Sequence, residues 1–261
     1  MSTAPEERGA LGDPESTRVA NQPRRAGENR HTPLVSVLIP TLDEARELPH
    51  LLDDLAALPG RWETIIADGG SCDATRQIAQ QHASRPRVVV HAGGRAAQLN
   101  AAAKVATGDV LLFLHADSRL PAGAYELLTA ADQEPDVVGG NFALRFDDGR
   151  GRFERLLGAV YRLQRRHGLY YGDSSVWATR VAFDALGGYR EIAIMDDYDF
   201  VRRLERGSGA TRCLPGPATT SARRWRSAGI ARTIFAWLLI RRLYLAGVPP
   251  GRLARLYRVV R

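Results

Sequence analysis

Short hydrophobic runs alternate with amphipathic stretches through the first half of the chain. The run at 34–39, LVSVLI, is rich in β-branched residues and predicts a strand that is covered on both faces. Leu48, Leu51, Leu52 and Leu55 follow at helical spacing. The same pattern then predicts a strand over 64–67, a helix over 73–82, a strand over 88–90, a helix over 94–106 and a strand over 110–114.

This order of elements is typical of one fold class. Strands that alternate with helices of about 10 to 15 residues form a mainly parallel, doubly wound α/β sheet. Ligands bind such sheets at the carboxyl ends of the strands. The polar residues after positions 39, 67, 90 and 114 are therefore the first candidates for a binding site.

The two ends of the chain differ from its centre. Residues 1–33 contain too few large aliphatic side chains to offset the entropy of ordering, so we expect a disordered leader. We expect a domain over 34–215, in two halves at 34–121 and 122–215, and a basic helical segment over 216–261. In that segment a first helix is predicted by Ile230, Ile234, Trp237 and Leu238, a break by Pro249 and Pro250, and a short last helix by Leu253, Leu256 and Tyr257.

The charge is distributed unevenly over this division. The chain has 36 basic and 29 acidic residues, a net charge of +7, yet residues 221–261 hold ten arginines and no Asp or Glu. The first 220 residues therefore carry a net charge of −3, and the basic character belongs to the C-terminal segment. Two interpretations of the segment stay open: helices packed on the domain with their arginines outward, or an interfacial surface that attracts anionic lipid.

Cysteine usage and hydropathy bound the setting of the protein. Cys72 and Cys213 lie far apart without a CxxC or Cys/His cluster, so neither a disulfide framework nor a zinc site is expected. No signal-peptide pattern opens the chain, and the longest strongly apolar run, 234–240, is far shorter than the roughly 20 residues of a membrane span. We expect a cytoplasmic protein, and the arginines extend this to peripheral contact with an anionic membrane at its inner face.

Polar residues gather at the first three strand ends. PTLDE at 40–44 lacks the GxGxxG of a dinucleotide-binding turn. In DGGSCD at 68–73 the glycines allow a ligand to approach the backbone, and Asp68 offers a carboxylate to a base or ribose; a tight turn capped by Asp73 explains the same residues. Arg95 follows two glycines, where it is suited to a phosphate or simply to solvent.

The fourth strand ends in His115-Ala116-Asp117-Ser118. A carboxylate directly after a buried strand is well placed to hold Mg²⁺ or Mn²⁺ against a diphosphate. These hard cations take few protein ligands and complete their coordination with phosphate and water.

Taken in order, PTLDE, DGGSCD, GGRAAQLNAA and ATGDVLLFLHADS resemble the nucleotide-sugar-binding half of family 2 glycosyltransferases, which have the GT-A fold. The acceptor half is resembled by Gly172-Asp173, Gly187-Gly188-Tyr189 and Met195-Asp196-Asp197. With VVGGNF, GDSS and TTSARRW, the chain is most similar to the small bacterial branch associated with radical-SAM and selenodomain genes. The resemblance covers 34–261.

The sequence departs from the family pattern at three motifs. An Asp-x-Asp motif is replaced by His115-Ala116-Asp117, so one carboxylate is expected at the metal and the role of His115 stays open. Asp68-Gly69-Gly70-Ser71 keeps only the first acid of the DDGS motif. The Gln-x-x-Arg-Trp motif of processive relatives survives at 221–225 without its glutamine and no transmembrane helices follow, so polymer synthesis is disfavoured.

The resemblance implies an inverting hexosyl transfer from a nucleoside-diphosphate sugar, with UDP favoured and GDP open, to a small or lipid-linked acceptor. Asp197 is expected to be the general base and Asp196 is the competing assignment, although a helix dipole alone would also favour two acids there. Mn²⁺ or Mg²⁺ at Asp117 is expected to neutralise the diphosphate. The implied nucleotide-sugar set is Pro40, Thr41, Glu44, Asp68, Gly70, Arg95, Asn100, Ala116 and Asp117, and the acceptor set is Gly172, Asp173, Arg224 and Trp225.

Two other classes of function are weighed against this one. A nucleotidyltransferase shares metal and nucleotide chemistry on a similar sheet, but it releases pyrophosphate. A nucleic-acid-binding protein would explain the ten arginines, yet it leaves the acidic strand ends unexplained and no nucleic-acid motif accompanies them.

Overall fold

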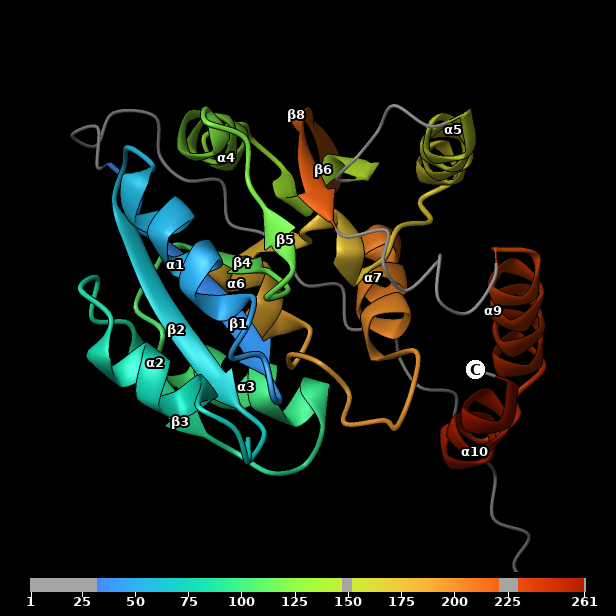
Figure 1. Cartoon of the computed structure of the whole chain (residues 1–261). Helices are drawn as coiled ribbons and strands as arrows, with labels where there is room; N and C mark the ends of the chain where they lie inside the picture. Colours follow the sequence, from blue (N-terminus) through green and yellow to red (C-terminus); the bar gives the residue numbers. More distant parts are fainter. Residues whose placement is uncertain (1–31, 147–151, 221–229, 261) are drawn as a thin grey trace, which may run out of the picture.

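A computed structural model describes residues 32–146, 152–220 and 230–260 (Figure 1). Within these ranges the strands form one sheet of eight, in the order β3-β2-β1-β4-β7-β6-β8-β5. The strands are β1 Val35–Thr41, β2 Trp62–Asp68, β3 Arg87–Val90, β4 Val110–Phe113, β5 Ser118–Arg119, β6 Val137–Phe146, β7 Trp177–Thr179 and β8 Ala210–Thr220. The leader predicted for 1–33 lies outside the described residues, apart from its last two positions.

Helices lie on both sides of this sheet (Figure 1). The α-helices are α1 Leu48–Ala57, α2 Thr75–Gln81, α3 Arg95–Val105, α4 Ala124–Asp132, α5 Arg152–Arg166, α6 Arg180–Ala185, α7 Asp196–Arg206, α9 Ile230–Leu245 and α10 Pro250–Val260, and a short 3₁₀ helix, η1, spans Gly172–Ser174. No helix in the described ranges is long and apolar enough to span a membrane.

The half of the sheet built from β1 to β4 is parallel. β1 pairs with β2 on one side and with β4 on the other, and β3 extends the sheet beyond β2. The side chains of the central strand β1 are buried almost throughout, because helices cover both faces of the sheet there, and this explains why its sequence lacks polar alternation. The strands and helices predicted for 34–114 are present with small shifts at their ends; β1, for example, passes Pro40 and ends at Thr41.

The second half of the sheet is mixed. β7 pairs antiparallel with β4 and β6, β5 pairs antiparallel with β8, and β6 pairs parallel with β8. The expected domain boundary between residues 215 and 216 falls inside β8, whose second half pairs with β5 and β6. The sheet therefore continues to Thr220, because backbone pairing rather than composition determines where the strand ends.

Two apolar layers enclose the sheet. On one face the leucines of α1 and Leu128 of α4 pack with β-strand residues such as Ile39 and Trp177. On the other face Leu99 of α3 and Phe200 of α7 pack against Phe113 of β4. Because both faces are covered, polar side chains gather where the strands end, which is where the candidate site lies.

The last two helices pack on this body through aromatic side chains. Tyr171, Tyr198, Ile240 and Leu253 share one buried cluster, and Trp237 packs partly buried against it. The ring centroids of Tyr171 and Trp237 lie 3.9 Å apart. In Figure 1, α9 forms an edge of the molecule with no described element outside it. One face of the C-terminal helices is thus packed on the domain, as the first interpretation of the segment expected.

Candidate active site

Asp68 organises the loop that follows β2. Its side chain is fully buried, and its Oδ2 accepts hydrogen bonds from the backbone N–H groups of Gly70 (3.0 Å) and Ser71 (2.9 Å). Its Oδ1 accepts from the hydroxyls of Ser71 and Thr41, the latter at 3.3 Å. Burial tends to raise the pKa of Asp68, but these hydrogen bonds outweigh it and lower the pKa. The expected pair Thr41 and Asp68 is therefore brought together, with the carboxylate held ionised.

The loops after β1 and β2 interlock through further polar contacts. Asp43 Oδ1 accepts from the N–H of Cys72 at 2.8 Å. Glu44, expected to hold the nucleotide, donates its backbone N–H to Thr75 Oγ1 at 2.8 Å, and its side chain is half-buried. We call residues 41–47 and 68–75 together the strand-end loops. Hydrogen bonds within the chain fix their shape.

Gln98 of α3 joins the ends of β1 and β2. Its Nε2 donates to the carbonyls of Thr41 and Ala67, both at 2.9 Å. A Cβ at Gly69 would lie 2.7 Å from this nitrogen, so glycine is needed for the approach. Gln98 was not among the expected site residues; the available signal was a polar residue on an alanine-rich helix that starts at a strand end.

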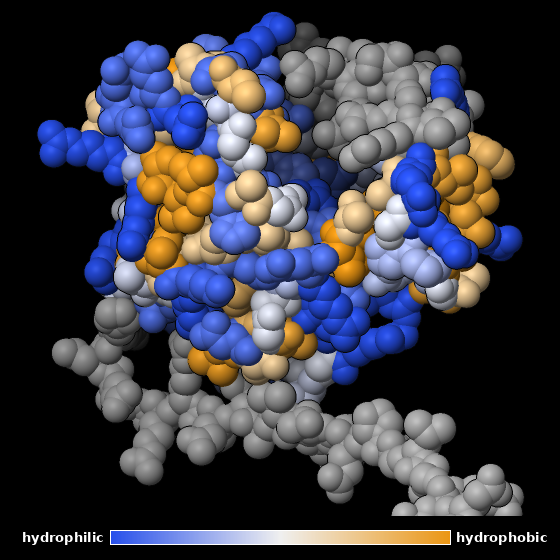
Figure 2. Space-filling model, turned by 90° about the horizontal axis from the view of Figure 1, so that it is seen from below, coloured by the Kyte–Doolittle hydropathy of each residue, from blue (hydrophilic) through white to orange (hydrophobic). Residues whose placement is uncertain are grey.

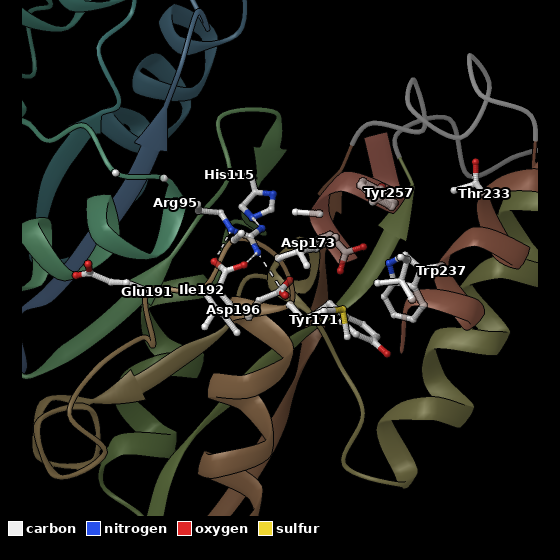
Figure 3. Close-up of a pocket in the computed structure, with 18 of the residues that line it drawn as sticks. Arg95, His115, Tyr171, Asp173, Glu191, Ile192, Asp196, Thr233, Trp237 and Tyr257 are labelled. Carbon is white, nitrogen blue, oxygen red and sulfur yellow. Dashed lines mark hydrogen bonds and ion pairs between the residues drawn. The ribbon is translucent and has the colours of Figure 1, made fainter. Parts of the chain in front are cut away.

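Arg95, the first residue of α3, joins two halves of the domain. Its Nε and NH2 donate to the two oxygens of Asp196 at 2.9 and 2.6 Å, and NH2 lies 3.3 Å from Asp197 Oδ1. Its NH1 is 3.5 Å from His115 Nε2 (Figure 3). Burial disfavours the charged guanidinium, but the carboxylates of Asp197 and Asp196 outweigh it and raise the pKa of Arg95. We call these four residues the charged cluster.

Asp197 is held from several directions at the start of α7. Its Oδ2 accepts from the N–H of Gly172 at 3.0 Å and its Oδ1 from the N–H of Tyr198 at 2.8 Å. Burial tends to raise its pKa, but Arg95 and these N–H groups keep the pKa below its ordinary value. Met195, in the left-handed conformation before the helix, turns the chain so that both acids lie in the first turn.

Gly172 lies against the charged cluster because it has no side chain. A Cβ there would be 3.0 Å from His115 Nε2 and 3.3 Å from Asp197 Oδ2. Pro40, Arg95, His115, Gly172 and Asp197 line one small recess, together with four apolar or aromatic residues. The structure thus places Pro40, near the end of β1, in the same recess as Asp197, the expected base.

Asp173 and Asn100 have different surroundings. Asp173 accepts a hydrogen bond from the hydroxyl of Tyr161 at 2.7 Å and lines the cavity that is described below. Asn100, expected to bind the nucleotide, instead exchanges two hydrogen bonds with the backbone of Tyr189, at 2.8 and 2.9 Å. Asn100 therefore fastens the loop that contains Gly188 to α3.

Asp117 follows His115 of the charged cluster by two residues. It is half-buried between β4 and β5, next to the buried Ala116, and neither lines the main cavity. Among the described residues no three His, Cys, Asp or Glu side chains group as a metal site. A single carboxylate, that of Asp117, fits a hard cation that takes its remaining ligands from a bound diphosphate and water. It does not fit a cation that the protein alone coordinates. Arg224 and Trp225 lie outside the described residues.

A cavity of about 620 Å³ opens beside the charged cluster. Figure 3 shows Arg95, His115 and Asp196 on one side and Trp237 and Tyr257 on the other. One wall comes from the domain: Gly93, Gly94, Arg95, His115, Tyr161, Tyr171, Asp173 and 191–197. The other wall comes from α9 and α10: Thr233, Trp237, Ile240, Ala254 and Tyr257.

The sequence analysis did not assign the second wall to the site. Thr233, Trp237 and Ile240 are spaced four and three residues apart, which places them on one helix face. That spacing was visible, but it does not say what the face packs against. The basic segment therefore contributes to the candidate site rather than lying apart from it.

A mainly parallel sheet with polar residues at its strand ends is the architecture of the GT-A class, and solved structures of that class superpose on it. Among solved structures, mannosyltransferase PcManGT from Pyrobaculum calidifontis, in complex with GDP-Man and Mn²⁺, superposes with a TM-score of 0.65 at 20% identity. The match covers 88% of this chain and 69% of that one. The predicted GT-A fold is confirmed.

Residues 36–190, more than half of the chain, match the family model Glycosyl transferase family 2. A PGL/p-HBAD biosynthesis glycosyltransferase of Mycobacterium bovis is 31% identical over 203 residues, which are 71% of this chain and 72% of the relative. An undecaprenyl-phosphate 4-deoxy-4-formamido-L-arabinose transferase of Pseudomonas savastanoi is 37% identical over 116 residues, 40% of this chain and 34% of the relative.

The chain belongs to glycosyl transferase family 2. The prediction of a glycosyltransferase enzyme is confirmed.

Proposed function

We propose that the protein transfers a sugar, with inversion, from a nucleoside-diphosphate sugar to an acceptor hydroxyl in the cavity, with Asp197 as general base. The hydroxyl oxygen forms a bond to the anomeric carbon, the bond from that carbon to the diphosphate oxygen breaks, and the hydroxyl proton passes to the Asp197 carboxylate. The supporting observation is an ionised carboxylate at the cavity wall, held by the N–H groups of Gly172 and Tyr198.

The contacts of the two acids favour Asp197 over Asp196. Both oxygens of Asp196 are engaged by Arg95, at 2.6 and 2.9 Å, in the bidentate geometry of a strong ion pair. Asp197 meets the same guanidinium only at 3.3 Å, and its side chain is 17% exposed compared with 7% for Asp196. Asp197 is thus the more accessible proton acceptor, and Asp196 positions Arg95.

The donor would lie along the strand ends. Pro40, Thr41, Glu44, Asp68 and Gly70 collect where β1 and β2 end, and would hold the nucleoside. Arg95 would supply positive charge to the diphosphate. Drawing Arg95 toward a diphosphate would weaken its hold on Asp197, and the pKa of that carboxyl would then rise, which strengthens the base. UDP and GDP both remain donors to test.

A divalent cation would be coordinated in this donor site by both the protein and the diphosphate. Asp117, with Ala116 beside it, follows β4 at the same edge of the sheet, and would hold Mn²⁺ or Mg²⁺. The cation would neutralise charge on the departing diphosphate.

The cavity lining supports an uncharged acceptor hydroxyl. The described lining residues include four carboxylates, Asp173, Glu191, Asp196 and Asp197, and one guanidinium, Arg95. This excess of negative charge disfavours an anionic nucleophile. Tyr171 and Trp237 add aromatic surface, on which sugars or rings can pack. A hydroxyl on a small or lipid-linked molecule suits this lining.

The deciding experiment compares Asp197→Asn with the surface control Asp184→Asn on the exposed face of α6. Donor binding is measured by calorimetry with UDP-, GDP- and dTDP-sugars and Mn²⁺, and turnover is measured as release of nucleoside diphosphate. Asp197→Asn is expected to lower turnover at least 100-fold, the scale of general-base catalysis, with donor affinity within about twofold. Wild-type turnover in Asp197→Asn would remove that residue from the mechanism.

A further inference from the structure

Helix α9 has two apolar faces, and only one of them is packed on the domain. Thr233, Trp237, Ile240 and Tyr244 follow each other at spacings of four, three and four residues and face the cavity or the aromatic cluster. A second series, Phe235, Leu238, Arg242 and Leu245, is displaced from the first by one or two residues. At about 100° per residue, the mean directions of the two series differ by roughly 150°, so the second series lies on the outward side.

The outward series is exposed to solvent. Phe235 is 65% exposed, Leu238 47% and Leu245 50%. Among the described residues these are three of the eight large hydrophobic side chains with high exposure, and no other helix carries as many. A helix that is apolar on both sides is usually buried on both sides. Its outward side therefore needs an explanation beyond packing within the chain.

Exposed basic residues occur on the same two helices, α9 and α10. Arg232 and Arg242 of α9 and Arg252 and Arg255 of α10 are exposed. No acidic residue occurs after position 220, so no carboxylate of this segment offsets them. In Figure 2 the lobe formed by the two helices carries hydrophobic and hydrophilic residues side by side. Apolar side chains among arginines match the boundary between acyl chains and anionic headgroups.

We propose that the outward face of α9, defined by Phe235, Leu238, Arg242 and Leu245, docks on an anionic lipid bilayer. The aromatic and aliphatic side chains would enter the headgroup region, and the arginines would pair with lipid phosphates. The cavity, on the opposite face of the same helix, would then lie about one helix diameter, ~10 Å, from the lipid surface. The docking surface does not depend on the proposed transfer chemistry, because none of its residues belongs to the charged cluster.

The test is co-sedimentation of the full chain with vesicles. Vesicles of phosphatidylcholine with 30% phosphatidylglycerol (about a third anionic lipid, to create the surface potential that attracts basic segments) are compared with pure phosphatidylcholine. Binding is expected only to the anionic vesicles and is expected to weaken as salt rises. Equal binding to both vesicle types, or binding to neither, overturns the proposal.

Paired variants separate docking from nonspecific attraction. Phe235→Ser/Leu238→Ser is expected to weaken vesicle binding at least tenfold, whereas Val181→Ser, an exposed apolar residue on α6, should leave it unchanged. Arg242→Ala is expected to weaken binding about fivefold, the share of one basic residue at an anionic surface, and Arg206→Ala on α7 should have no effect. Circular dichroism verifies that each variant folds.

Other occupants of the surface give different results. If the face binds a second copy of the chain, light scattering will show a dimer that the Phe235→Ser/Leu238→Ser variant dissociates, with no vesicle binding. If the face binds nucleic acid, a duplex oligonucleotide will compete with vesicles, and the Phe235→Ser/Leu238→Ser variant will bind the oligonucleotide as tightly as the wild type does. Either result overturns the proposal. Asp197→Asn should bind vesicles normally, so failure of the transfer mechanism and failure of docking are distinguishable.

Discussion

The strand-end loops and the charged cluster satisfy their carboxylates in different ways. In the loops, Asp68 and Asp43 accept from backbone N–H groups and hydroxyls close by, and the network is complete within the N-terminal half. In the charged cluster, Asp196 and Asp197 share the guanidinium of Arg95, about 100 positions earlier in the chain, in addition to the backbone N–H groups that Asp197 accepts from, and both acids lie beside an open cavity. The first arrangement fixes a shape, while the second holds charge where a reaction can use it.

The largest effect is expected from removing the cation of the charged cluster. Arg95→Ala leaves two neighbouring carboxylates without the guanidinium they share, so we expect the free energy of unfolding to fall by about 2 kcal/mol. This loss is smaller than for a fully buried ion pair because the side chain of Arg95 is partly exposed to solvent. Turnover should fall at least 100-fold. Urea unfolding and nucleoside-diphosphate release measure the two effects.

A control in the other region sharpens this result. Arg76, whose side chain is half exposed, lies 3.8 Å from Asp68, and Arg76→Ala should cost at most about 1 kcal/mol. The double variant Arg95→Ala/Asp196→Ala should recover part of the lost stability. Equal costs for Arg95→Ala and Arg76→Ala would contradict the difference drawn between the regions.

A smaller effect is expected from the loop carboxylate. Asp68→Asn replaces an acceptor of backbone N–H groups by an amide, and it should lower the free energy of unfolding by about 1 kcal/mol at pH 7. The pKa of Asp68 in the fold lies below 3.8, so its stabilisation is complete above the unfolded pKa and is lost as pH falls through the folded value.

The difference in stability between the wild type and Asp68→Asn should therefore be largest above about pH 5 and should shrink as the pH falls below about 4, toward the lowered pKa of Asp68 in the fold. Denaturant titrations from pH 3 to pH 7 measure this difference. A gap that stays constant over the range would show that Asp68 contributes no charge-dependent stability. Asp184→Asn is again the matched control, with no expected change at any pH.

The smallest effect concerns contact rather than charge. Gly172→Ala adds a methyl group 3.0 Å from His115 Nε2 and 3.3 Å from Asp197 Oδ2, which forces one of the two to shift by a few tenths of an ångström. We expect turnover to fall about tenfold, since small displacements of catalytic groups are costly, with a stability change below about 1 kcal/mol. Gly251→Ala, where an added methyl group meets nothing, should retain full activity.

The sequence predicted the loops better than the cluster. Thr41 and Asp68 follow strands that are adjacent in a parallel sheet, so their meeting follows from topology alone. The ion pair between Arg95 and Asp196 joins residues 101 positions apart, and no local pattern indicates it. Periodicity likewise placed Trp237 on a helix face but gave no information on the partner of that face. The boundary expected at residue 215 rests on composition and falls inside β8, because strand pairing depends on distant residues.

The interlocked loops have a consequence for the rate of binding. Ordering a loop costs about 1 to 2 kcal/mol of backbone entropy per residue, and folding has already ordered the strand-end loops through Asp68, Asp43 and Gln98. A molecule that arrives there meets a preorganised edge, so encounter and orientation set its association rate. The cavity, in contrast, takes one of its walls from α9 and α10, so its shape depends on how these two helices pack on the domain.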